Sequence, residues 1–93
     1  MVVGIVRLGL HISDCQSLKE KRSIIKSLTQ RLRNKFNAAI AEIADQDLWQ
    51  KSTIGAAVIG NSTAHASSQL QSIIDFIEKQ PMVLIITIET EIL

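Results

Sequence analysis

Residues 16–36 read QSLKEKRSIIKSLTQRLRNKF, and this stretch predicts an amphipathic helix. Ser17 and Glu20 fit a capping box: the Ser17 hydroxyl accepts from the Glu20 amide, while the Glu20 carboxylate reaches back to the cap amide. The helix should therefore begin at Leu18, and Asn37, which tolerates left-handed backbone, is expected to end it. At about 100° per residue, the apolar positions form one broad face that should pack on a sheet. They are Ile24, Ile25, Leu28, Leu32 and Phe36.

The segments around this helix are typical of strands. Residues 2–12 and 82–93 alternate between two sides with period two. Residues 38–44 (AAIAEIA) and 53–60 (TIGAAVIG) are strand-length runs on either side of a polar turn, and we expect them to form a hairpin. A second helix is predicted from residue 62 to about residue 80, with Asn61 as its cap and Pro81 enforcing its end.

This order, β-α-β-β-α-β, predicts a single α+β domain over residues 1–93 with the ferredoxin-like sandwich fold. That fold is a four-stranded antiparallel sheet with both helices on one face. Right-handed crossovers give the strand order 4-1-3-2.

The sheet face without helices should then be exposed to solvent and carry both polar and apolar side chains. On the first strand, Arg7 and His11 point to this face together with Val3 and Ile5. Strict alternation of the last strand adds Val83, Ile85, Glu89 and Glu91, and turns Met82, Leu84 and Ile86 toward the helices. This is more apolar surface than a monomer usually leaves open, so a homodimer joined through that face or an edge is expected.

Charge is concentrated in the first helix. Residues 16–36 hold seven basic residues and one acid, a net charge of +6, whereas residues 1–15 sum to zero and residues 37–93 to −5. Lys19, Arg22, Lys26 and Arg33 fall within about 60° of arc, and Lys21 lies at the helix mouth. We expect these five residues to bind nucleic acid or phosphate. The alternative interpretation is a solvated face whose long side chains cover apolar surface.

Other residues give weaker signals. No aromatic residue lies in residues 2–12 or 53–60, which argues against base stacking on the sheet in the manner of an RNA-recognition motif. His11 and Cys15 do not make a convincing metal site, so neither a metal nor a cofactor is expected. Trp49 is interpreted as a core or dimer-contact residue, and together with Arg7 and His11 it is a candidate for an interface or a ligand site.

The setting expected from composition is the cytoplasm. Cys15 is the single cysteine and cannot form an internal disulfide, no signal peptide precedes the first strand, and no apolar run is long enough to span a bilayer. We therefore expect a soluble protein in a reducing compartment.

Several segments together resemble a known family. They are MVVG at the start, SLKEKR at residues 17–22, AEI at 41–43, QDLWQ at 46–50 and IDFIE at 74–78. Over essentially all 93 residues the chain resembles the YlxP family of small bacterial proteins, also called DUF503. The resemblance implies a ferredoxin-like fold and a context of translation or ribosome maturation. The family has no established catalytic residues.

The leading hypothesis is a non-enzymatic, dimeric binding protein that contacts structured RNA or a ribosomal particle through the first helix. The alternative is a small-ligand-binding or regulatory homodimer that uses the open sheet face near Arg7 and His11. No residue set provides a nucleophile, a base and a stabilising group together, so the chain is not expected to be an enzyme.

Overall fold

The computed structural model describes all residues from Met1 to Leu93 and has six regular elements. In chain order they are β1 (Val2–Ile12), α1 (Leu18–Lys35), β2 (Ala39–Ala44), β3 (Lys51–Gly60), α2 (Thr63–Glu78) and β4 (Val83–Ile92). Every predicted element is present, and its bounds agree with the prediction to within about two residues.

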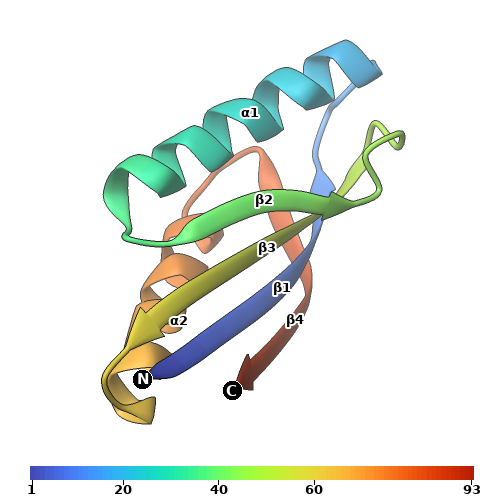
Figure 1. The fold of residues 1–93 in the computed structure, drawn as a ribbon. Helices are drawn as coiled ribbons and strands as arrows, with labels where there is room; N and C mark the ends of the chain where they lie inside the picture. The colour runs from blue at the N-terminus through green and yellow to red at the C-terminus, as the bar shows by residue number, and fades with distance from the viewer.

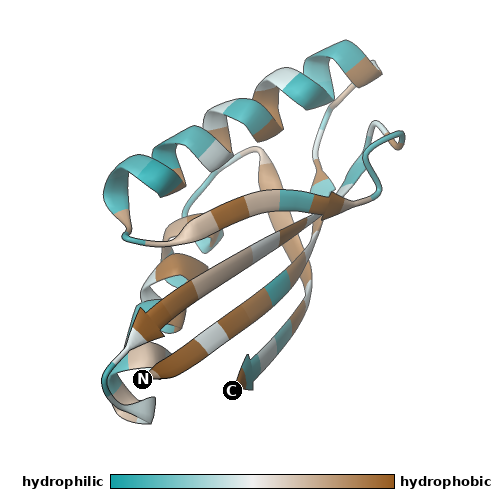
Figure 2. Ribbon diagram, in the orientation of Figure 1, coloured by the Kyte–Doolittle hydropathy of each residue, from teal (hydrophilic) through white to brown (hydrophobic).

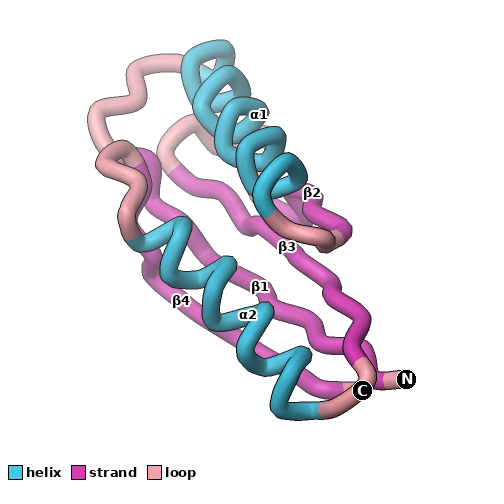
Figure 3. The backbone as a smooth tube through the Cα atoms, turned by 90° about the vertical axis from the view of Figure 1, so that its left-hand side faces the viewer, coloured by secondary structure: helices cyan, strands magenta, loops and turns pink.

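The four strands form one antiparallel sheet in the order β2-β3-β1-β4, which is the predicted order 4-1-3-2. Both helices lie on the same side of this sheet (Figure 3). The α+β ferredoxin-like layout is therefore confirmed. We call the side of the sheet without helices the open face.

The core lies between the sheet and the two helices. Successive residues of β1 alternate between buried and less buried, since every second side chain points to the helices. Hydrophobic residues dominate the ribbons of β1 and β3, whereas α1 is largely hydrophilic (Figure 2). Neither helix is both long and apolar enough to cross a membrane. The fully buried apolar side chains include Leu8, Leu10, Ile12, Leu32, Ile54, Ile73 and Ile77.

Three details of the helix ends differ from the prediction. Ser62 caps α2, because its hydroxyl accepts from the His65 amide, so Asn61 is not the cap. At the end of α1, Phe36 is the capping residue in extended backbone. The positive φ angles outside glycine belong to Asp14 and Asp45, so Asn37 is not left-handed.

The last strand departs from strict alternation at a β-bulge. Leu10 lies opposite Ile85 and Gly9 lies opposite Thr87, which leaves Ile86 as an extra residue. An extra residue reverses which side chains face the helices. The prediction was therefore wrong before the bulge: Val83 is buried and Ile85 packs against the core, while Met82, Leu84 and Ile86 are exposed.

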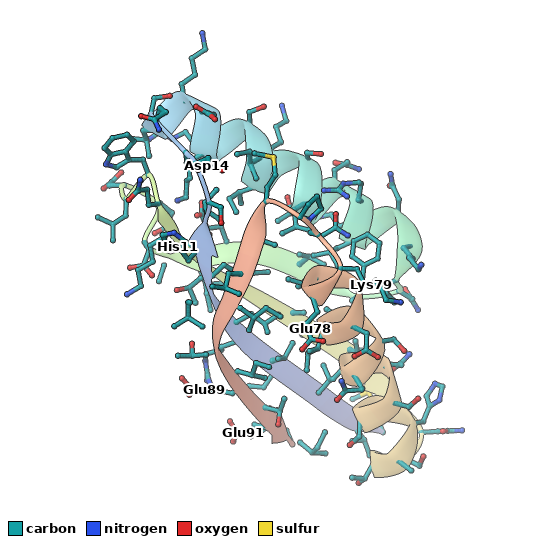
Figure 4. All side chains as sticks on the ribbon, turned by 180° about the vertical axis from the view of Figure 1, so that it is seen from behind. His11, Asp14, Glu78, Lys79, Glu89 and Glu91 are labelled. Carbon is teal, nitrogen blue, oxygen red and sulfur yellow. The ribbon has the colours of Figure 1, made fainter.

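After the bulge the prediction was right. Glu89 lies opposite Arg7 and Glu91 lies opposite Ile5, so both carboxylates share the open face with β1. Figure 4 shows His11 and Glu89 along the side of the sheet that faces away from α2.

Candidate nucleic-acid interface

Helix α1 begins where the sequence predicts, and its first turn is capped by side chains. The Glu20 amide donates to the Ser17 hydroxyl at 3.1 Å. The Glu20 carboxylate accepts from the Gln16 amide at 3.3 Å. The predicted donor was the amide of the cap residue Ser17, which is the next residue along the chain. The first bond satisfies an amide of the helix terminus that lacks an intrahelical acceptor, and the second ties the preceding residue to the first turn. The start of α1 is therefore fixed by local bonds.

One side of α1 carries four exposed basic side chains, which we call the basic stripe. Its members are Lys19, Arg22, Lys26 and Arg33. Lys19 and Arg33 are fourteen residues apart, so the stripe extends over about 21 Å. No acidic residue occurs between Lys21 and Phe36, so like charges are not neutralised along the helix itself.

The stripe borders β2 and the loop that follows it. At one end, an Arg22 nitrogen lies 3.9 Å from the Asp47 carboxylate, and both side chains are largely exposed. An exposed pair at this distance contributes little stability. At the other end, Arg33 donates to the Ile40 carbonyl of β2 at 2.7 Å. Because that acceptor is neutral, Arg33 keeps its charge while covering part of an edge strand.

Lys21 does not belong to this surface, and its predicted role in phosphate binding is wrong. Its side chain is fully buried. Its Nζ donates to the Glu42 carboxylate at 2.6 Å and to the carbonyls of Asp45 at 2.9 Å and Gln46 at 3.4 Å. Lys21 therefore joins the start of α1 to β2 and to the following turn.

A spacing in the sequence could have revealed this. Lys21 precedes Ile25 by four residues, Leu28 by seven and Leu32 by eleven, which places it on the buried face of α1. A lysine at such a position needs an acid and further acceptors, because an unpaired buried charge is costly. Glu42 meets that need, and it also accepts from the buried Ser52 hydroxyl at 2.6 Å.

The loop between β2 and β3, residues 45–50, is held at both ends. At its start the Asp45 carboxylate accepts from Thr53 at 2.8 Å, and the Leu48 amide donates to the Asp45 carbonyl at 3.1 Å. At its end the Gln50 side chain donates to the Cys15 carbonyl at 3.2 Å, while the Gln50 carbonyl accepts from the Ile12 amide at 2.9 Å. The loop lies beside the first turns of α1 (Figure 1).

This fixed loop exposes two large apolar side chains. Trp49 is 45% exposed and Leu48 is 47% exposed. The interpretation of Trp49 as a core residue is therefore wrong, whereas its role as a contact residue stays a prediction.

Arg7 and His11 lie on the open face, as predicted. An Arg7 nitrogen is 3.8 Å from the Glu89 carboxylate. His11 lies between Lys51 of β3 and Leu84 of β4 in the sheet register. No group of three or more His, Cys, Asp or Glu residues is arranged to hold a metal ion, and Cys15 is buried with its thiol donating to the Ser17 carbonyl.

The fold and this surface define a small ferredoxin-like α+β domain with one basic helix and one braced loop. The chain belongs to the DUF503 family, described as "Protein of unknown function (DUF503)", which matches residues 3–90. It is 38% identical over 80 residues to "Uncharacterized protein YlxP" of Bacillus subtilis (strain 168), and this alignment covers 86% of the chain and 87% of that protein. The family resemblance seen in the sequence is thus confirmed.

Proposed function

We propose that this protein is a non-enzymatic binding protein that contacts RNA or a ribosomal particle through the basic stripe of α1. The observation that carries the proposal is the exposure of Lys19, Arg22 and Lys26 on one side of a helix free of acids after Glu20. Arg33 extends the same side with its charge intact.

The packing of α1 on the sheet is explained by other residues of the helix. The apolar face of α1 and the buried Lys21 already account for its docking on the sheet. Cations in the first turn of a helix are also disfavoured by the helix dipole, by a few tenths to about 1 kcal/mol when exposed. Lys19 lies in that turn nonetheless and Arg22 in the next one, and phosphate groups are ligands that such a surface attracts.

If the protein binds RNA through its phosphates, its affinity for RNA should depend strongly on salt concentration. If four side chains each neutralise one phosphate of a single strand, the logarithm of the association constant falls with a slope of about −2.8 against the logarithm of salt concentration. Affinity should then fall by about 50-fold between about 50 mM and about 200 mM salt.

The test compares two variants of equal charge. Lys19→Gln/Lys26→Gln removes two lysines from the stripe, whereas Lys51→Gln/Lys79→Gln removes two exposed lysines elsewhere. RNA or ribosome co-sedimentation at two salt concentrations should show weaker binding and a slope reduced by about 1.4 for the first variant alone. Equal binding by the two folded variants would refute the proposal.

A second candidate function is a regulatory homodimer built on the open face. Ile59 of β3 is exposed there, next to Val3 in the sheet register, and Ala39, Ala41 and Ala57 add a shallow apolar surface. A second copy of the chain is the occupant favoured by charge. Arg7 and Lys51 on the same face are balanced by Glu89 and Glu91, so two copies can meet without net repulsion.

Sedimentation tests this candidate. At micromolar concentration the wild-type protein should sediment as a dimer, and Ile59→Lys should shift it to monomer by placing a charge in the interface. A wild-type monomer at that concentration would exclude the dimer.

A further inference from the structure

Trp49 is the side chain whose exposure the fold leaves unexplained. A tryptophan has the largest apolar area of any residue, and folding usually covers most of it. Here nearly half of its surface faces solvent, beside the equally exposed Leu48.

The loop that presents Trp49 is rigidly anchored. Lys21 binds the carbonyls of Asp45 and Gln46 on one side of Trp49, and Gln50 is bonded to β1 and to the Cys15 carbonyl on the other. A contact residue held in this way loses little conformational entropy when it binds. The burial of Lys21 therefore serves the presentation of Trp49 as well as the fold.

The anchored loop is continuous with the basic stripe. Asp47 lies two residues before Trp49 and is 3.9 Å from Arg22, and Gln50 follows Trp49 directly and reaches Cys15 at the start of the α1 segment. Trp49 thus lies at the end of the stripe formed by Lys19 and Arg22.

The size of the exposed apolar patch favours a nucleobase over a protein. A specific protein interface buries about 1,200–2,000 Å² in total. Leu48 and Trp49 are two half-exposed side chains, flanked in the sequence by the polar exposed residues Gln46, Asp47 and Gln50, and two such side chains cannot supply that area. One face of an indole ring, by contrast, is sufficient to stack a base, and any base has a face to offer.

We propose that Trp49 stacks on an unpaired base of an RNA whose phosphates lie along Lys19, Arg22 and Lys26. This inference rests on the proposed RNA contact of α1 and adds a preference for single-stranded or looped RNA. In a duplex the bases are already stacked on one another, so Trp49 can engage only a base that is free.

The protein carries its own probe for this contact. Trp49 is the sole tryptophan and the chain has no tyrosine, so its ultraviolet fluorescence reports on this side chain. Titration with a single-stranded oligouridine should quench the fluorescence, while a duplex RNA of equal length should bind without quenching. Trp49→Ala should weaken binding of the single strand by about tenfold or more, and Trp49→Phe should restore part of the loss.

Leu48→Ala is the matched control, since Leu48 is on the same loop and equally exposed but cannot stack. It should leave single-strand affinity unchanged. Equal affinity of Trp49→Ala and wild type would overturn the stacking contact while the α1 contact stands. An equal loss in Leu48→Ala and Trp49→Ala would also overturn it, because Leu48 cannot stack on a base and the loss would then not require stacking. Absence of RNA binding by the wild type would overturn both proposals.

Discussion

Replacing Lys21 by methionine removes the charged side chain that α1 buries completely. Its Nζ has three acceptors within 3.4 Å, namely one Glu42 carboxylate oxygen and the carbonyls of Asp45 and Gln46. Removing one partner of a buried ion pair costs about 3–5 kcal/mol, because the other charge remains uncompensated. The Glu42 side chain is 17% exposed and keeps its bond from Ser52, so we expect the lower value, about 3 kcal/mol.

The free energy of unfolding can be measured by urea denaturation followed by circular dichroism. For a domain of this size, a loss of about 3 kcal/mol corresponds to a fall in Tm of about 12–24 °C. Arg22→Met is the control, because its pair with Asp47 is exposed at 3.9 Å, and it should change the free energy of unfolding by less than about 0.5 kcal/mol.

A double-mutant cycle then isolates the pair. Lys21→Met/Glu42→Gln should recover much of the stability lost in Lys21→Met, since no unpaired buried charge remains. A loss below about 1 kcal/mol in Lys21→Met would refute the view that this pair anchors the loop.

Three further predictions about the fold can be tested by the same denaturation. Ser17→Ala removes the cap of α1 and should cost about 0.5–2 kcal/mol, and an unchanged midpoint would contradict the capping role. Gly9→Ala should destabilise because its Cβ would collide with the Thr87 hydroxyl at the bulge, and adding Thr87→Ala should relieve this. Leu8→Ala, at a fully buried position, should cost about 3–5 kcal/mol, whereas Ile86→Ala at an exposed position should cost much less.

The elements of this fold could be predicted because their signals are local. The cap of α1 at Ser17 depends on a bond three residues along the chain, and helical or strand periodicity is visible within about a dozen residues. The strand order followed as well, since short antiparallel connections and right-handed crossovers leave few topologies.

The predictions were wrong where contacts with other parts of the chain decide the local structure. Ile86 becomes a bulge because β4 must pair with β1 on both sides of Gly9, which no pattern within β4 records. Asn61 and Ser62 are equally good caps by residue type, and only the backbone at the start of α2 selects Ser62.

The candidate site also has features that local sequence predicts and features that depend on tertiary contacts. The sequence by itself determined that one helix carries seven of the ten basic residues, and that Lys19, Arg22, Lys26 and Arg33 share one side of it, because helical geometry is local. Helical spacing also places Lys21 on the buried side of α1, but only the tertiary structure supplied its partner, since Glu42 is 21 residues away along the chain. Lys21 also donates to the carbonyls of Asp45 and Gln46 in the loop. The exposure of Trp49 was likewise decided by the tertiary structure, because the burial of a side chain depends on which distant segments pack around it.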